Sequence, residues 1–280
     1  MTLSELNSLI ISDLTPALGQ GEAKATARML LEDDLHVTPT TLFTRGDRVL
    51  EPETVARYRR FISRIAAGEP PQYVLGSARF MGMELKVTPA TLIPRPETAE
   101  LVDIITDRCK NRPDLRVLDI GTGSGCIALA LSRALPFANV EGIDISAEAI
   151  AVASENARKL GAKVDFHVQD IFSAPAATYD IIVSNPPYIA ESERLSMERR
   201  VKDFEPGSAL FVPDSDPLRF YTAITAYAKS NLDDGGLLAV EINPRFAEEL
   251  KSMMESCGFN CEIIRDSFGK NRFALGTHAS

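Results

Sequence analysis

Hydrophobic residues in the first quarter of the chain recur at intervals of three and four positions. This spacing places apolar side chains on one face of an α-helix. It occurs in three segments separated by glycine and proline: LSELNSLIISDL, KATARMLLEDDL and ETVARYRRFISRIAAG. Residues 1–75 are therefore expected to form a small helical domain.

The pattern changes to a period of two in residues 78–92, ARFMGMELKVTPATL. Such alternation around a central glycine predicts two short strands. We expect residues 76–92 to be a β-hairpin linker between two domains. Pro94 and Pro96 follow in TLIPRPET and predict extended backbone before a helix that begins near Glu97.

From about residue 114, apolar strands alternate with amphipathic helices. The predicted strands are RVLDI, NVEGIDI, KVDFHVQDIF, YDIIVSN and GLLAVEIN, and the helices are CIALALSRAL, AEAIAVASENARKL, DPLRFYTAITAYAKSNL and RFAEELKSMMESC. This order is typical of an α/β fold with a doubly wound, mostly parallel sheet. CEIIRDSF and NRFALG leave no room for a helix between them, so an antiparallel C-terminal hairpin is expected. Residues 93–280 form the predicted second domain.

Composition narrows the class of protein. The 280 residues are 45% hydrophobic and 25% charged, as in ordinary soluble proteins. The net charge of −9 disfavours binding driven by nucleic-acid phosphates, so no stable nucleic-acid binding is expected. The absence of a membrane-spanning segment or signal sequence favours a cytoplasmic location. The four cysteines and three histidines form no ligand pattern, so no metal site is predicted.

A glycine-rich loop follows the strand RVLDI and precedes a helix. Its residues are Gly121, Thr122, Gly123, Ser124 and Gly125. Asp144 ends the next strand about 20 residues later, where an acid can accept hydrogen bonds from ribose hydroxyls. The spacing G-x-G-x-G differs from the G-x-G-x-x-G of dinucleotide sites. A nucleoside without a pyrophosphate, such as S-adenosylmethionine, therefore fits better.

Two further acids lie at predicted strand ends. Asp119 precedes the glycine loop and either caps the turn or orients the loop or a cofactor ammonium; we favour orientation. Asp170 is predicted to accept from an adenine N6 amine, with Ile171 or Phe172 against the ring. Apolar residues at strand ends also commonly belong to the core.

The stretch SNPPYI closes the strand YDIIVSN. Its two prolines have no N–H to donate, so the sheet ladder stops in a stiff turn. The predicted target is a planar nitrogen, either an amide or an exocyclic aromatic amine. The Asn185 side-chain oxygen and the Pro186 carbonyl would accept its protons. Pro187 stiffens the turn, and the ring of Tyr188 can lie against the planar group.

These motifs resemble those of a known family. Asn-Pro-Pro-Tyr is similar to the signature of amino-methyltransferases that modify adenine, cytosine or glutamine nitrogens. With GEPPQYVLG, TLIPRPET, VLDIGTGSG and VKDFEPGSAL, the chain resembles the release factor glutamine methyltransferases of the PrmC/HemK family. The resemblance implies a class I S-adenosylmethionine-dependent, Rossmann-like methyltransferase domain. Because every cofactor motif lies beyond residue 90, residues 1–75 are expected to be a substrate-recognition domain.

The resemblance implies a reaction and a partner. A methyl group passes from S-adenosyl-L-methionine to N5 of the glutamine in the Gly-Gly-Gln motif of peptide chain release factors, leaving S-adenosyl-L-homocysteine. The implied cofactor residues are the glycine loop, Asp144, Asp170, Ile171 and Asn185. The implied substrate residues are Asn185, Pro186, Pro187 and Tyr188, of which Asn185, Pro186 and Tyr188 are catalytic.

Some questions stay open at this point. A nucleic-acid adenine-N6 methyltransferase would use the same Asn-Pro-Pro-Tyr chemistry and is the alternative function. The chain departs from the family pattern at FVPDSDP and at Asn243, where similar proteins often carry glycine. Arg95 and Glu97 either close over the cofactor or form only an ion pair in the linker.

Overall fold

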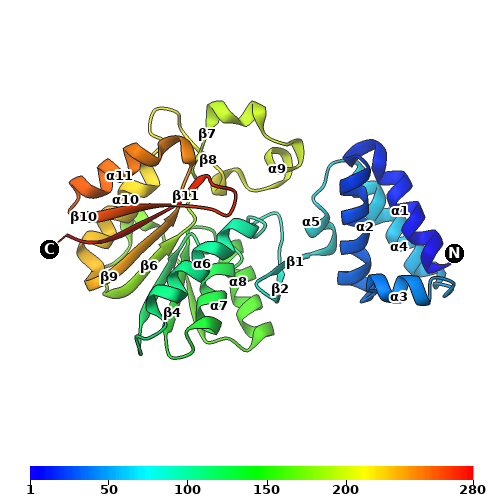
Figure 1. The fold of residues 1–280 in the computed structure, drawn as a ribbon, viewed down its shortest axis with the longest axis horizontal. Coiled ribbons are helices and arrows are strands. Elements are labelled where there is room, and N and C mark those ends of the chain that lie inside the picture. Colours follow the sequence, from blue (N-terminus) through cyan, green and yellow to red (C-terminus); the bar gives the residue numbers. More distant parts are fainter. Residues whose placement is uncertain (280) are drawn as a thin grey trace. The chain divides into compact units, whose positions relative to one another are not determined.

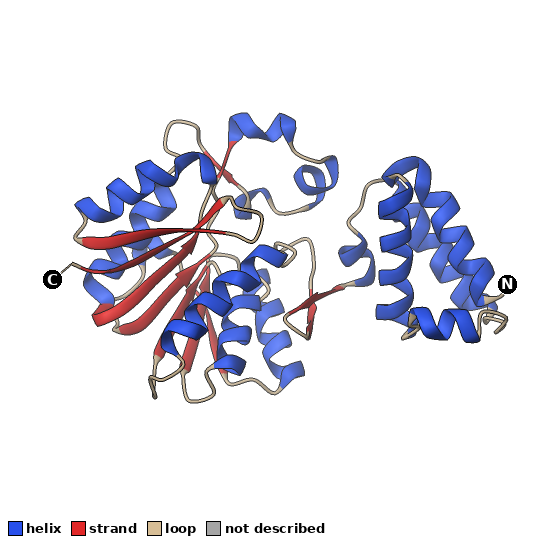
Figure 2. Cartoon of the chain, viewed as in Figure 1, coloured by secondary structure: helices blue, strands red, loops and turns tan. Residues whose placement is uncertain are grey.

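The computed structural model describes residues 1–279, and the chain divides into two compact units. The first unit contains Met1–Ser77 and also the short segment Glu198–Phe204. The second unit contains Ala78–Met197 and the residues from Glu205 onwards. Figure 1 follows the chain by colour, and Figure 2 distinguishes its helices from its strands.

The first unit is helical, as predicted. Its helices are α1 (Leu3–Leu18), α2 (Gln20–Leu35), α3 (Pro39–Thr44), α4 (Pro52–Ala66), α5 (Pro71–Leu75) and α9 (Arg199–Phe204). The apolar positions of α1 that recur every three or four residues are buried in a common core. Thr2 and Glu5 close the start of α1 by accepting each other's backbone N–H. Gly19, with a φ of +78°, separates α1 from α2.

The predicted hairpin is present but shorter than its sequence pattern. Strands β1 (Ser77–Phe80) and β2 (Met83–Lys86) pair with each other, and residues 87–92 are not strand. The buried Asn156 side chain accepts from the Lys86 N–H at 2.6 Å and donates to the Lys86 carbonyl at 3.0 Å. It also donates to the Ser124 carbonyl at 2.9 Å, which ties the hairpin to the glycine loop.

A seven-stranded sheet forms the centre of the second unit, in the order β10-β11-β9-β6-β3-β4-β5. Its strands are β3 (Arg116–Ile120), β4 (Asn139–Asp144), β5 (Val164–Val168), β6 (Tyr179–Ser184), β9 (Leu232–Glu241), β10 (Phe259–Arg265) and β11 (Asn271–His278). Strands β5, β4, β3, β6 and β9 run parallel, whereas β11 pairs antiparallel with both β9 and β10. The doubly wound sheet and its antiparallel C-terminal hairpin are confirmed.

Helices cover both faces of this sheet. Helices α6 (Pro96–Cys109), α7 (Cys126–Ala134) and α8 (Ala147–Leu160) lie on one face, and α10 (Arg219–Asn231) and α11 (Ala247–Ser256) lie on the other (Figure 1). Consecutive strand residues point to opposite faces, so Val117 joins the core under α6 and α7 while Leu118 joins the core under α10 and α11. Burial on both faces explains why the strands read as continuous apolar runs.

Two predicted segments differ in the structure. The strand predicted for KVDFHVQDIF ends at Val168, because Asp170 accepts from the Phe172 N–H and begins a short 3₁₀ turn, η1 (Ile171–Ser173). The region between SNPPYI and DPLRFYTAITAYAKSNL, for which the sequence pattern predicts no strand or helix, contains elements of its own. These are β7 (Ile189–Ala190), η2 (Glu191–Ser196), α9, η3 (Gly207–Ala209) and β8 (Phe211–Val212), with β7 and β8 paired in parallel.

Candidate active site

The sheet register brings three predicted site segments to one edge. Ile120 of β3 pairs with Ile143 of β4 on one side and with Ser184 of β6 on the other. The residues that follow these three are Gly121, Asp144 and Asn185. In a doubly wound sheet the carboxyl ends of neighbouring parallel strands border the ligand crevice. The glycine loop, Asp144 and Asn-Pro-Pro-Tyr therefore begin at the same level of the same crevice.

The glycine loop folds over the end of β4. The N–H groups of Gly121 and Thr122 both donate to the Ile143 carbonyl, at 2.8 and 3.0 Å. Gly123 donates its N–H to the Asp144 carboxylate at 3.0 Å. The loop is thus fastened to the neighbouring strand by its own backbone.

Room for a ligand lies beside two of the three glycines. A Cβ atom at Gly121 or Gly123 would meet no other atom within 4 Å, and both residues have positive φ angles, +71° and +55°. A Cβ atom at Gly125 would lie only 3.0 Å from the Phe166 ring. Gly125 therefore serves close packing, whereas Gly121 and Gly123 leave open space in which a ligand can approach the backbone.

Asp144 is half-buried at the end of β4. One oxygen accepts from Gly123 N, and the other accepts from Ser146 N at 2.9 Å. A carboxylate oxygen has more than one acceptor position, so each can accept a second hydrogen bond. The two backbone donors fix the plane of the carboxylate, which suits the recognition of two neighbouring hydroxyls.

Asp119 is fully buried beneath the glycine loop. One oxygen accepts from the Thr122 hydroxyl at 2.6 Å and from Ala128 N at 3.2 Å, whereas the other has no hydrogen-bond partner. Burial raises the pKa of Asp119 from 3.8 to about 7, and the charge of Asp144 adds to the rise. A buried carboxylate with an unpaired oxygen suits a cationic ligand. These residues fit S-adenosylmethionine, which carries an ammonium and a sulfonium.

Asp119 makes the stability of the ligand-free protein pH-dependent. Because its folded pKa lies above the unfolded value, its stabilising contribution is complete below pH 4 and is lost as the pH rises through about 7. The loss amounts to about 4 kcal/mol at most. We expect the free energy of unfolding of Asp119→Asn, relative to that of wild type, to increase between pH 5 and pH 8. Urea unfolding at both pH values measures this difference. A difference that stays constant across this range would contradict the assignment.

The predicted adenine subsite contains a local structure that the sequence did not reveal. Asp170 accepts from Phe172 N at 3.0 Å, so one carboxylate oxygen caps the 3₁₀ turn. Ile171 packs partly against the core, whereas Phe172 is half-exposed and lies 5.7 Å from the Phe220 ring. The Arg219 guanidinium lies over both rings. Gln169 N donates to the Asp144 carbonyl at 2.9 Å, so Asp170 and Ile171 follow directly after a residue that is bonded to the end of β4.

The Asn-Pro-Pro-Tyr turn is fixed to the strands beneath it. Ser184 is buried and donates its hydroxyl to the Ile120 carbonyl at 2.7 Å. Asn185 is half-buried and donates from Nδ2 to the Thr98 hydroxyl at 3.3 Å. Pro186 is buried, and Tyr188 donates its hydroxyl to Glu241 at 3.0 Å. The Asn185 side chain is thus held through its nitrogen, and its oxygen is not used in this hydrogen bond.

Sequence reasoning missed the residues behind this turn. Thr98 lies in α6 and Glu241 at the end of β9, so both are remote from residue 185 in the chain. Glu241 is 1% exposed and accepts from Thr98 at 2.8 Å as well as from Tyr188. Burial raises the pKa of Glu241, and the hydrogen bonds from Thr98 and Tyr188 oppose that rise. The signal available in the sequence was Glu241, an acidic residue at the end of an apolar strand.

The ion pair between Arg95 and Glu97, one of the two roles considered for these residues, is not formed. Arg95 pairs instead with the buried Glu205 at 2.6 Å, and Glu205 also accepts from Ile93 N at 3.2 Å. The IPRPE and FEP motifs are therefore joined through one carboxylate. Whether Arg95 also closes over a cofactor stays a prediction.

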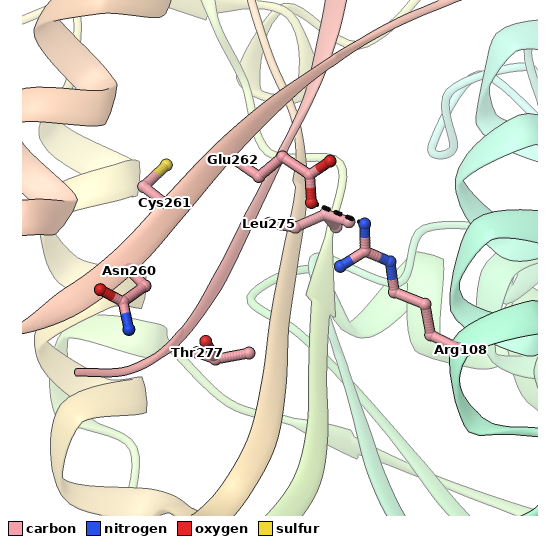
Figure 3. A pocket seen from close by; sticks show the side chains of 6 residues that line it. All are labelled: Arg108, Asn260, Cys261, Glu262, Leu275 and Thr277. Atoms are coloured by element: carbon pink, nitrogen blue, oxygen red, sulfur yellow. Dashed lines mark hydrogen bonds and ion pairs between the residues drawn. The ribbon is translucent and has the colours of Figure 1, made fainter. Parts of the chain in front are cut away.

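Figure 3 shows a pocket at the surface of the second unit. It is lined by Arg108, Asn260, Cys261, Glu262, Leu275 and Thr277. Arg108 of α6 pairs with Glu262 of β10 at 2.6 Å across it. None of the predicted site residues lines this pocket, so we assign it no part in the reaction.

Two further findings concern metals and membranes. Within residues 1–279, no three His, Cys, Asp or Glu side chains are grouped so that they could hold a metal ion. In the same part of the chain, no helix is both long and apolar enough to span a bilayer.

Comparison with known proteins places these observations in context. Residues 98–201 match the family model "Methyltransferase small domain", and residues 11–76 match "PrmC N-terminal domain". A release factor glutamine methyltransferase from Bacteroides thetaiotaomicron is 43% identical over 96% of this chain and 98% of its own. Another from Koribacter versatilis is 37% identical over 90% of both chains. A solved methyltransferase from Pyrococcus furiosus has the same fold, with a TM-score of 0.54 and 18% identity over 78% of this chain and 98% of its own.

Proposed function

Because the chain belongs to the release factor glutamine methyltransferases, we propose that it methylates the side-chain amide of a glutamine in peptide chain release factors. The target is N5 of the glutamine in the Gly-Gly-Gln motif. The observation that carries the proposal is the common register of Gly121, Asp144 and Asn185 at one sheet edge. The similar relatives do not favour the nucleic-acid alternative, and a cytoplasmic location stays a prediction.

The glycine loop and two acids would hold the cofactor. Gly121 and Gly123 leave open space beside the backbone, Asp144 would accept from the ribose hydroxyls, and Asp119 would face the positive charge. When bound, S-adenosylmethionine supplies an electrophilic methyl group on a sulfonium. Asp170 and Ile171 would border the adenine.

The Asn-Pro-Pro-Tyr turn would orient the glutamine. An amide nitrogen is a weak nucleophile because its lone pair is delocalised over the carbonyl. The Asn185 oxygen and the Pro186 carbonyl would accept its two hydrogens and direct the lone pair at the methyl group. Tyr188 would flank the planar amide, and Pro187 would hold the turn rigid. The sulfonium–methyl bond breaks as the nitrogen–methyl bond forms, S-adenosylhomocysteine leaves, and the methylated nitrogen releases one proton to water. Catalysis on this account is positioning and electrostatics, without a covalent enzyme intermediate.

Methyl transfer from labelled S-adenosylmethionine tests this function. We expect label on purified release factor and none on duplex DNA incubated in parallel. A tryptic digest should carry one methyl group on the glutamine of Gly-Gly-Gln. Label that appears as N6-methyladenine, or that persists after this glutamine is changed to alanine, would overturn the proposal.

The helical unit is the proposed docking site for the body of the release factor. Its own buried core supports an independent role, and the candidate site residues lie outside it. A chain that lacks residues 1–75 should bind cofactor normally and methylate a short Gly-Gly-Gln peptide as well as the full chain does. Its kcat/KM for intact release factor should fall by about tenfold or more, because remote binding energy is lost.

The peptide is the control for damage to the active site. Helix α9 would lose partners in this truncation, since Arg200 forms an ion pair with Glu22. Equal losses on peptide and on intact release factor would mean that the truncation disturbs the catalytic turn. Unchanged kcat/KM on intact release factor would refute docking.

A further inference from the structure

The end of strand β9 lies directly behind the Asn-Pro-Pro-Tyr turn. Val240 of β9 pairs with Ser184 of β6, so Glu241, the last residue of β9, lies at the same level as Asn185. Glu241 is almost completely buried. The Tyr221 hydroxyl donates to the Glu241 carbonyl at 3.0 Å, which fixes the backbone from which the carboxylate extends.

Each oxygen of the Glu241 carboxylate accepts from a different part of the site. Oε2 accepts from the Thr98 hydroxyl at 2.8 Å, and Oε1 accepts from the Tyr188 hydroxyl at 3.0 Å. Thr98 is buried as well. A carboxylate can only accept, so both hydroxyls must donate to it. Neither hydroxyl hydrogen is then available for another acceptor.

The hydrogen bond from Thr98 to Glu241 determines the orientation of the Asn185 side-chain amide. Thr98 has one hydroxyl hydrogen, and that hydrogen is given to Glu241. Towards Asn185 the Thr98 oxygen can therefore only accept, and it accepts from Nδ2 at 3.3 Å. If the amide were turned over, two acceptor oxygens would face each other without a hydrogen between them. The Asn185 oxygen is consequently directed away from Thr98.

Tyr188 is fastened to the same strand end by two groups. Its hydroxyl donates to Glu241, and its backbone carbonyl accepts from Asn243 Nδ2 at 3.0 Å. Asn243 also donates to Glu193 at 3.0 Å, and its own oxygen accepts from Arg245 N. Glu241 and Asn243 together hold the last residue of the turn, while Glu241 alone connects it with Asn185.

We propose that Glu241 is a positioning residue, which acts through Thr98 to present the Asn185 oxygen to the substrate amide and through the Tyr188 hydroxyl to place the ring. The inference rests on the proposed function, because it deepens the role of the same turn. Glu241 touches neither substrate nor cofactor in this account. Its effect is therefore expected on kcat rather than on the affinity for cofactor.

Glu241→Gln is the first test, since it retains size and removes one acceptor. A glutamine Nε2 that donates to Thr98 lets the hydroxyl donate to Asn185 and favours the turned-over amide. We expect kcat to fall by on the order of 10- to 100-fold, with cofactor Kd and KM for release factor nearly unchanged. Thr98→Val should have a similar effect, and Thr98→Ser should recover most of the loss.

A double-mutant cycle shows whether the effect passes through Asn185. In the Asn185→Ala background, Glu241→Gln should cause little further loss of kcat. Additive losses would overturn the inference, as would a single variant Glu241→Gln with wild-type kcat. Asp180→Asn is the matched control, because this acid accepts from Arg112 and Arg116 at the opposite end of β6. The control should keep wild-type kcat.

A readout without turnover separates this inference from the proposed function. The side-chain ¹⁵N amide resonance of Asn185 should shift in Glu241→Gln and in Thr98→Val but not in Asp180→Asn. Wild-type protein that fails to methylate release factor would refute the proposed function and leave this resonance test valid. An Asn185 resonance that is unmoved in both variants would refute the positioning role while release-factor methylation stands.

Discussion

Replacing Asn185 with alanine is expected to lower kcat for release-factor methylation by about 10²–10³. The side chain donates from Nδ2 to Thr98, and its oxygen is left to accept from the substrate amide. This contact matters most in the transition state, because the glutamine lone pair becomes available only as the amide loses its planarity. Cofactor Kd should therefore stay nearly unchanged. Single-turnover kinetics and calorimetry provide the two measurements.

Asn185→Asp tests whether a hydrogen-bond acceptor of the same shape at this position is enough for activity. An aspartate at this position still offers an acceptor oxygen to the substrate, so part of the activity should survive. Its second oxygen would face Thr98, whose only hydrogen is given to Glu241, so recovery should be incomplete. Loss of cofactor affinity equal to the loss of kcat would show that Asn185 serves mainly in cofactor binding.

Asp144→Ala is expected to weaken S-adenosylmethionine binding by about 1–3 kcal/mol, or by more where the charge contributes. The carboxylate would accept from the ribose hydroxyls, and it also accepts from Gly123 N and Ser146 N. Its removal therefore takes away a ligand contact and loosens the glycine loop. Isothermal titration calorimetry with S-adenosylhomocysteine measures the change without turnover.

Asp165→Ala provides the matched control for this substitution. Asp165 is an exposed carboxylate on β5, one strand beyond β4 in the sheet. The control should bind cofactor as the wild type does, because Asp165 is exposed and the effect of its charge is screened by water and salt. An unchanged affinity of Asp144→Ala for the cofactor would contradict the assignment of Asp144 to the ribose hydroxyls.

The sequence predicted the parts of the site that are local in the chain. The glycine loop, Asp144 and Asn-Pro-Pro-Tyr each follow an apolar strand, and strands of this kind reveal where their carboxyl ends lie. Parallel neighbouring strands have their carboxyl ends at one edge of the sheet, so these three motifs meet there. The antiparallel C-terminal hairpin was predicted because too few residues separate its strands.

The partners behind the site could not be predicted in this way. Thr98 and Asn185 are 87 positions apart, and Tyr188 and Glu241 are 53 apart, so no local pattern connects them. Asn156 lies within the amphipathic helix α8, and its contacts with the hairpin and the glycine loop depend on packing of three elements. The end of β5 was misplaced because Asp170 forms a local cap where apolar residues continue the strand pattern.

The interruption of the second unit by Glu198–Phe204 affects how the protein can be divided. These seven residues belong with the N-terminal helices, while the chain on both sides of them belongs with the sheet. A protease cut after Ser77 would leave α9 covalently joined to the sheet at both ends, with Arg200 still paired with Glu22. A chimera that exchanges the helical unit between relatives must therefore carry α9 with it, although more than 100 residues separate the two segments.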